Sequence, residues 1–156
     1  MKNNFKALIL HLIIVILSFI FLIIFVATGP KIGKFTTNFI SRIFIGVGLL
    51  FVYIFSGTLL DESTRKEYDF FVGSLIGVIG IAIWLYTFSN TEMNLLKIIP
   101  EELSENWILM NIYYTPFTLV NFLFGLPNTP ILSLIANLIP TLLLGLGLKY
   151  KRFKNT

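Results

Sequence analysis

The residues best suited to chemistry in this chain are polar side chains inside long apolar runs. In the run at 107–126 they recur at offsets of 3, 4, 7, 10 and 14 residues, which places them on one face of a helix. These residues are Asn111, Tyr114, Thr115, Thr118, Asn121 and Gly125. The run at 130–148 carries a second stripe: Ser133, Asn137, Thr141 and Gly145. Amides and hydroxyls can hydrogen-bond between membrane helices, so the stripes predict two adjacent polar faces.

The two stripes admit three interpretations: a packing seam, a polar groove that binds a ligand or passes a solute, or an oligomer contact. Pro116 and Pro140 lie in the middle of their runs and free backbone carbonyls from helical hydrogen bonds. Neighbouring groups often satisfy such carbonyls in membrane helices, so the prolines favour the groove only slightly. The candidate ligand or partner groove comprises Arg42, Asn111, Tyr114, Thr115, Asn121, Asn137 and Thr141.

Arg42 belongs to this set because it lies about one turn inside the run at 39–60. A cation at this depth either extends its side chain to the membrane surface or faces the bundle and pairs with an anion. In the second case we expect the partner to be a carboxylate of the connection at 89–106. Its candidates are Glu92, Glu101, Glu102 and Glu105.

Other polar residues carry weaker signals. His11, the only histidine, has no Cys, Asp or Glu near it in the sequence, so we expect a hydrogen-bonded interface histidine and no metal site. The connection after the second run is predicted to be a solvated turn, because it carries four acidic residues: Asp61, Glu62, Glu67 and Asp69. The chain lacks the G-x-S-x-G, H-E-x-x-H and P-loop patterns. We therefore expect no catalytic residue, no cofactor and no enzyme activity.

Gly73 and Gly77 form a GxxxG pair in the run at 70–88. This spacing is typical of closely packed membrane helices. The pair therefore predicts helix packing, either inside the chain or between two copies of it.

The elements that must position these residues are five apolar runs at about 7–28, 39–60, 70–88, 107–126 and 130–148. Each approaches the ~20 residues that a helix needs to cross a bilayer. The chain is 56% hydrophobic and only 13% charged, whereas soluble domains have about 25% charged residues. These features predict an all-α, polytopic transmembrane helical bundle of about five spans, with residues 1–156 forming a single domain.

Two further features refine this architecture. The first apolar run is longer than the hydrophobic part of a signal peptide, so we expect an uncleaved first span. The runs at 107–126 and 130–148 are separated only by Leu126-Pro127-Asn128-Thr129-Pro130, which predicts a tight helical hairpin.

Orientation follows from Lys and Arg, which favour the cytoplasmic side. Five spans place the termini on opposite sides, and the basic residues then divide eight against four. The larger group is Lys31, Lys34, Arg42, Lys97, Lys149, Lys151, Arg152 and Lys154. We therefore expect the tail to be cytoplasmic and the N-terminus and the 61–69 turn to be external. An even number of spans, with the fourth run re-entrant, is the alternative, because Lys2 and Lys6 precede the first span.

We expect a multi-pass protein of a bacterial cytoplasmic membrane that acts by binding within the membrane, as an accessory, regulatory or immunity-type partner protein. Its expected partners are the lipid bilayer and either another membrane protein or a second copy of the chain. Nucleic acid is not expected, because the basic residues lie at helix ends and not on one water-facing surface. The alternatives are a small transporter or channel subunit and, third, a lipid-modifying enzyme.

Overall fold

The computed structural model describes residues 2–28, 38–62 and 65–155, and this part of the chain contains helices and no strand. The α-helices are α1 (Lys2–Ala27), α3 (Phe39–Thr58), α4 (Ser74–Ser89), α5 (Ile108–Tyr113), α6 (Thr115–Phe124), α7 (Pro130–Ala136) and α8 (Ile139–Lys154). Two 3₁₀ helices, η1 (Lys66–Phe71) and η2 (Glu101–Trp107), precede α4 and α5. The predicted all-α helical bundle is confirmed.

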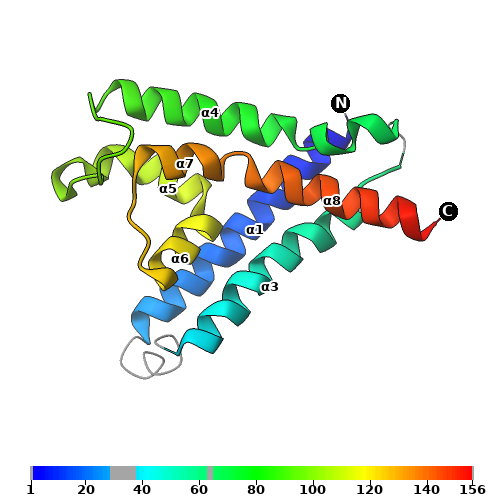
Figure 1. Cartoon of the computed structure of the whole chain (residues 1–156), viewed down its shortest axis with the longest axis horizontal. Helices are drawn as coiled ribbons and strands as arrows, with labels where there is room; N and C mark the ends of the chain where they lie inside the picture. The colour runs from blue at the N-terminus through cyan, green and yellow to red at the C-terminus, as the bar shows by residue number, and fades with distance from the viewer. Residues whose placement is uncertain (1, 29–37, 63–64, 156) are drawn as a thin grey trace.

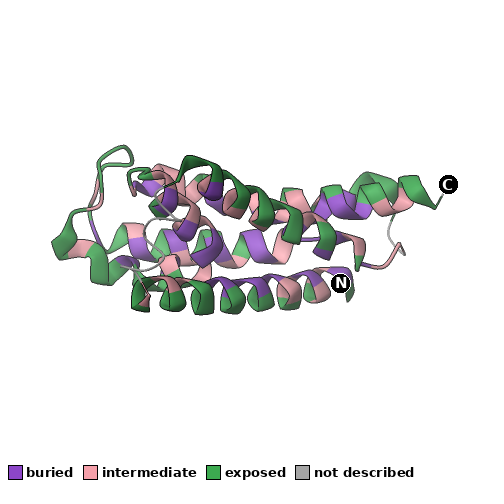
Figure 2. Cartoon of the chain, turned by 90° about the horizontal axis from the view of Figure 1, so that it is seen from below, coloured by how far each residue is buried: buried purple, intermediate pink, exposed green. Residues whose placement is uncertain are grey.

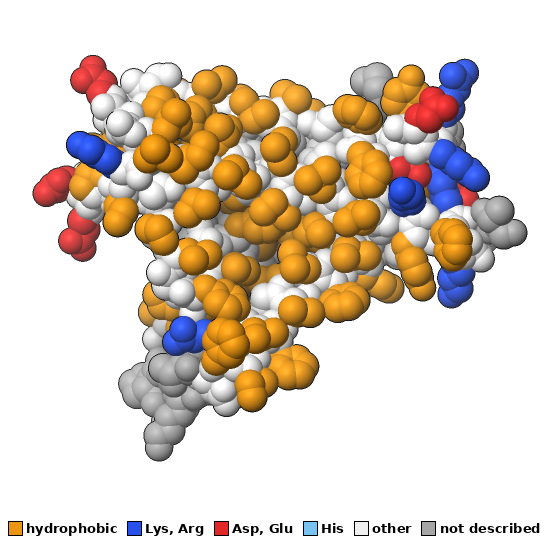
Figure 3. Space-filling view, viewed as in Figure 1, with side chains coloured by type: hydrophobic (Ala, Val, Ile, Leu, Met, Phe, Trp, Pro, Cys, Tyr) orange, Lys and Arg blue, Asp and Glu red, His pale blue; other side chains and the backbone are white. Residues whose placement is uncertain are grey.

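Four helical segments of the described chain are long and apolar enough to cross a membrane: Lys2–Ala27, Phe39–Thr58, Lys66–Ser89 and Pro130–Lys154. They indicate a membrane protein. Figure 3 agrees with this, because hydrophobic side chains cover the middle of the visible face and charged side chains gather at its ends. These segments correspond to four of the five predicted runs.

The fifth run, at 107–126, is interrupted at Tyr114, where α5 ends and α6 begins. Pro116 lacks an N–H and cannot bond to the carbonyl of Ile112. The Thr115 hydroxyl donates to that carbonyl instead, at 2.7 Å. A second proline has a similar effect at the other stripe, where α7 and α8 are separated at Asn137 and Leu138, just before Pro140.

The α5–α6 segment begins and ends at the same end of the molecule. It starts after η2, and the chain beyond α6 returns to the connection that precedes η2 (Figure 1). There the Ile99 N–H donates to the Asn128 carbonyl at 2.9 Å, and the Ile131 N–H donates to the Leu95 carbonyl at 3.1 Å. The predicted tight hairpin at 126–130 is therefore an irregular return segment.

Two glycines hold α8 against α3. A Cβ on Gly57 would overlap the Leu144 carbonyl oxygen, and a Cβ on Gly147 would overlap the Ile54 carbonyl oxygen. The backbones of the two helices therefore touch where they cross. Below this crossing α3 diverges from α7 and α8, and α6 and α1 lie alongside it (Figure 1).

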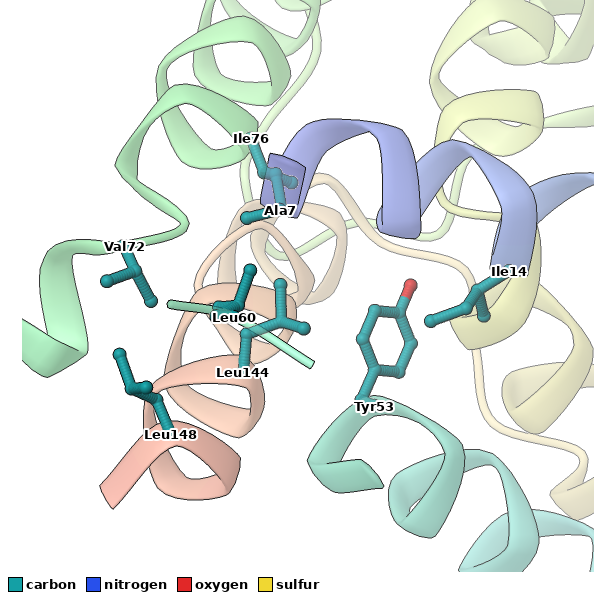
Figure 4. Close-up of a cluster of buried hydrophobic side chains, with 8 residues drawn as sticks. All are labelled: Ala7, Ile14, Tyr53, Leu60, Val72, Ile76, Leu144 and Leu148. Atoms are coloured by element: carbon teal, nitrogen blue, oxygen red, sulfur yellow. The ribbon is translucent and has the colours of Figure 1, made fainter. Parts of the chain in front are cut away.

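The main apolar core lies at the end of the bundle where α1, α3, α4 and α8 meet. Figure 4 shows its buried side chains: Ala7, Ile14, Tyr53, Leu60, Val72, Ile76, Leu144 and Leu148. A second cluster joins α4 to α5 through Trp84, Trp107, Met110 and Tyr114. Buried residues follow the inward faces of the helices, and exposed residues follow the outward faces (Figure 2).

Hydrogen bonds and ion pairs join both termini to the segment between α3 and α4. Lys6 pairs with Asp61 at 3.2 Å, and the Asn3 side chain donates to the Asp61 carbonyl at 2.6 Å. Arg152 pairs with Asp69 at 2.9 Å. We call this region the clamped end.

The clamped end overturns two expectations. Residues that touch cannot lie on opposite sides of a ~30 Å hydrocarbon layer, so the prediction that the tail and the 61–69 turn lie on opposite faces is wrong. The 61–69 turn is also more than a solvated surface, because Asp69 is buried.

Candidate functional site

Asn137 and Thr141, the middle of the polar stripe of the last run, face the first turns of α4 and the glycines Gly73 and Gly77. The Thr141 hydroxyl donates to the Gly73 carbonyl at 2.9 Å, and a Cβ on Gly73 would lie 2.9 Å from the Thr141 Cα. A Cβ on Gly77 would meet Thr141 and the Asn137 carbonyl at 3.8 and 3.9 Å. The GxxxG pair therefore packs within the chain, against Asn137 and Thr141.

A third glycine on this face, Gly80 of α4, lies where the two interrupted helices meet. A Cβ at Gly80 would overlap both the Tyr114 hydroxyl and the Asn137 side-chain oxygen. Tyr114 is 3% exposed and Asn137 is 0% exposed. The interruptions at Tyr114 and Asn137 therefore converge on one buried point beside α4.

Next to this point lies a histidine with three tyrosines around it. The His11 Nδ1 is 2.9 Å from the Tyr53 hydroxyl, and the His11 ring meets the Tyr113 ring edge-on at a centroid distance of 4.9 Å. Tyr113 donates to the Ile76 carbonyl at 3.2 Å. We call His11, Tyr53, Tyr113, Tyr114 and Asn137 the polar junction. His11 is thus a hydrogen-bonded interface histidine, as the sequence predicts.

The polar junction has unused hydrogen-bonding capacity. Within the described residues, the Tyr114 hydroxyl and both polar side-chain atoms of Asn137 are buried without a protein hydrogen-bond partner. Buried polar groups in proteins are nearly always bonded to protein or to ordered water. The described part of the chain contains no cluster of metal-ligating residues.

Other residues of the two polar stripes meet at a small cavity between α5, α6 and α7. Asn111, Tyr114, Thr118, Asn121 and Ser133 contribute to its lining, and its volume is about 10 Å³. Thr115 and Thr118 direct their hydroxyls to carbonyls of their own segment. A cavity of this size holds about one water molecule, so the point where Ser133 meets the stripe of α5 and α6 has room for nothing larger.

A much larger recess lies on the outer side of the polar junction, between α3, α6 and the start of α8. We call it the apolar groove. It is half-open, has a volume of about 330 Å³, and is lined by Ile43, Gly46, Val47, Leu49, Leu50, Tyr53, Pro116, Phe117, Val120, Phe124 and Ile139.

At the inner end of the apolar groove Tyr53 stacks on Phe117, with ring centroids 5.8 Å apart. The Tyr53 hydroxyl also hydrogen-bonds with His11. Tyr53 therefore belongs to both sites: its ring lines the groove and its hydroxyl faces the rest of the polar junction. A smaller apolar recess of about 260 Å³ lies between α1 and α3 and includes Gly48.

Arg42 lies apart from the other members of the predicted set. It is half-buried in the first turn of α3. Figure 1 places this turn at a different corner of the molecule from η2, which carries Glu101, Glu102 and Glu105. Arg42 is also absent from the lining of the apolar groove and of the cavity between α5, α6 and α7, so the structure does not bring it together with the other predicted residues.

Sequence reasoning missed Tyr53, Tyr113 and Gly80, and it missed the groove altogether. Gly80 continues the face of Gly73 and Gly77 after one further turn, and this spacing is the signal that could have identified it. Comparison with protein-family models, with curated proteins and with solved structures gives no match.

Proposed function

We propose that the chain is a four-span protein of a bacterial cytoplasmic membrane with both termini in the cytoplasm. The contacts of the clamped end support an even number of spans. The basic residues of the clamped end are Lys2, Lys6, Arg65, Lys66, Lys149, Lys151, Arg152 and Lys154, against Lys31, Lys34, Arg42 and Lys97 elsewhere. This excess supports a cytoplasmic clamped end. The frequent use of Ile, Phe, Lys and Asn supports a bacterial source.

Cysteine labelling tests this orientation, because the chain has no cysteine of its own. We expect Glu67→Cys and Asn155→Cys to resist an impermeant thiol reagent in intact cells and to react after permeabilisation. Lys97→Cys, in the connection at the other end, should react in intact cells. Both Glu67 and Asn155 are exposed, so burial would not account for their protection. Labelling of only one of these two sites in intact cells would contradict the proposal.

We further propose that the protein is non-catalytic and acts by binding an apolar segment of another molecule in the apolar groove. This groove is the observation that supports the proposal. Its volume of about 330 Å³ is within the range of ligand pockets, about 300–1,000 Å³. The sequence analysis names the polar stripes and the GxxxG pair as candidate partner surfaces. In the structure, Thr141, Asn137 and the two glycines contact one another within the chain. These internal contacts support the groove over the polar stripes as the binding surface.

Photocrosslinking from the groove tests binding directly. Val47 lines the groove and is exposed, so a benzophenone amino acid can replace it. We expect an adduct in native membranes, either with a lipid or with a protein. Gly46→Leu should lower its yield several-fold, because even a Cβ at Gly46 would reach 3.4 Å from the Phe124 ring and the longer side chain would fill the groove.

Gly48→Leu is the matched control for the crosslinking experiment. It adds the same side chain two residues later in α3, where a Cβ would meet nothing within 4 Å, and it projects into the other recess. The adduct should persist in this variant. Equal yields from both leucine variants would show that the groove is not the binding surface.

A small transporter or channel subunit is the second candidate. The observation that favours it is the convergence of two interrupted helices at Tyr114 and Asn137, because discontinuous helices form the central sites of many transporters. The cavity of about 10 Å³ between the stripes leaves no path for a solute in this conformation. Solute flux into liposomes, abolished by Asn137→Leu, would favour this candidate over binding alone.

A further inference from the structure

We infer that a recess at the clamped end binds the phosphate of an anionic phospholipid between Lys66 and Lys149. We call it the basic recess. It is half-open, has a volume of about 480 Å³, and is lined by Lys66, Asp69, Lys149, Arg152 and Phe153. This volume is within the range of ligand pockets, about 300–1,000 Å³. The inference goes beyond the proposed function, because it depends neither on the apolar groove nor on the orientation of the chain.

Two helix faces meet at the basic recess. Lys66 and Asp69 are three residues apart in η1, and side chains at this spacing eclipse in a 3₁₀ helix. Lys149, Arg152 and Phe153 are spaced by three and four residues in α8, which also places them on one face. The recess therefore has one lysine on each of two neighbouring elements.

Close packing sets the positions of these two elements. A Cβ on Gly145 would lie 2.8 Å from the Phe70 Cα and 2.9 Å from the Asp69 carbonyl oxygen, so α8 lies directly against the backbone of η1. The Lys149 ammonium group lies over the Phe70 ring, 5.7 Å from its centroid. The protein itself therefore holds α8 and η1 together, and the ligand does not have to assemble the recess.

The basic recess carries a net positive charge. Its lining has three basic side chains and one acidic side chain, which gives a formal charge of +2. The Arg152 guanidinium contacts both carboxylate oxygens of Asp69, so these two charges already balance. Among the described residues, neither Lys66 nor Lys149 forms a salt bridge with a carboxylate. An anion between the two ammonium groups therefore supplies the missing charge and leaves the Arg152–Asp69 pair intact.

The position of the basic recess favours a lipid phosphate over a free phosphate ion. One segment of spanning length begins at the recess, Lys66–Ser89, and another ends there, Pro130–Lys154. The ends of spanning helices lie at the level of the lipid headgroups. Phe153 lines the recess and is 83% exposed, so its ring provides an apolar surface for the part of a lipid next to its phosphate.

Three other recesses of the described chain lack this charge. The apolar groove and the recess between α1 and α3 have no charged residue in their lining. A recess between α1 and α4 has one, Lys2. Basic pockets between membrane helices are known to bind anionic headgroups. Charge complementarity therefore assigns the anionic phospholipid to the basic recess.

Native mass spectrometry of the purified protein tests the inference. The probes are phosphatidylglycerol and phosphatidylcholine with identical chains, supplied at equal concentration. Each lysine near a membrane surface favours an anionic lipid about fivefold, so we expect one phosphatidylglycerol per chain, preferred about 25-fold over phosphatidylcholine. Lys66→Gln and Lys149→Gln should each reduce the preference to about fivefold, and the double variant should remove it. Both lysines are exposed, so the melting temperatures of these variants should stay close to that of the unmodified protein.

Lys154→Gln is the matched control, because it removes an exposed basic residue of the same helix that does not line the recess. This variant should keep the full preference for phosphatidylglycerol. An equal loss of preference in Lys154→Gln and Lys149→Gln would show diffuse attraction to the basic tail and would overturn the inference. Selectivity that survives the double variant would also overturn it. The deacylated headgroup, glycerophosphoglycerol, should not displace the bound lipid; displacement at equal concentration would assign a water-soluble phosphate to the recess instead of a lipid.

Discussion

Gly147→Ala is expected to destabilise the protein strongly, although it adds only one methyl group. The Cβ of alanine at this position would overlap the carbonyl oxygen of Ile54 and lie 2.8 Å from the Cα of Gly57. Both atoms belong to the backbone of α3, so relief requires the two helices to move apart. Overpacking typically costs 1–3 kcal/mol, and occasionally more. We expect a loss of about 3 kcal/mol, measured by thermal unfolding in detergent.

Gly48→Ala is the matched control for this prediction. It makes the same change in the middle of α3, where the new Cβ would meet nothing within 4 Å. Alanine favours a helix over glycine by about 1 kcal/mol, so this variant should be neutral or slightly more stable. Similar melting temperatures for the two variants would contradict the close crossing of α3 and α8. A lower melting temperature for Gly48→Ala alone would show that Gly48, and not Gly147, lies at the close helix contact.

The sequence predicts the helices well because hydrophobic length is a local property. Four of the five apolar runs coincide with helical segments of spanning length. In the run at 107–126, Pro116 marks the interruption, and the sequence analysis identifies it as a residue that frees a carbonyl. Whether a break leads to a re-entrant segment depends on which residues the chain meets afterwards. The bonds of Ile99 to Asn128 and of Ile131 to Leu95 support the proposed re-entrant segment, and no local pattern contains them.

The predicted orientation depends on the number of membrane spans. Each additional span exchanges the sides of every later connection, so treating 107–126 as a full span placed the tail opposite the 61–69 turn. In the proposed four-span topology the same Lys and Arg residues again divide eight against four, but they form different groups. Charge counting is therefore reliable only when the number of crossings is known.

The candidate site was predicted in part, since periodicity identifies the face of a helix but not its neighbour. Asn137 and Thr141 do share a face, yet that face packs on Gly73 and Gly77 and only its edge approaches the Tyr114 segment. His11 and Tyr53 are 42 residues apart and meet through the packing of α1 on α3. The apolar groove arises where α3 diverges from its neighbours beside Gly46, which is a property of helix angles and not of any single segment.

Asp69→Asn is the second substitution expected to have a large effect. The Asp69 side chain is 2% exposed and the Arg152 side chain 12% exposed, and the guanidinium contacts both carboxylate oxygens, at 2.9 and 3.0 Å. Removing one partner of a buried pair typically costs 3–5 kcal/mol, because the other charge stays buried. Arg152 also donates to the Glu62 carbonyl at 3.1 Å, which offsets part of the loss. We therefore expect the free energy of unfolding to fall by about 3 kcal/mol.

Lys6→Gln provides the control, because it breaks the other ion pair of the clamped end. The side chains of Lys6 and Asp61 are 41% and 40% exposed, and exposed pairs contribute only about 0–1 kcal/mol. The double variant Asp69→Asn/Arg152→Gln should lose less than the sum of its single variants, since both remove the same interaction. Trypsin should cleave the 149–154 segment faster in Asp69→Asn than in Lys6→Gln, because Arg152 holds the end of α8 against η1. Equal stability and equal cleavage of Asp69→Asn and Lys6→Gln would show that the buried pair does not hold the tail in place.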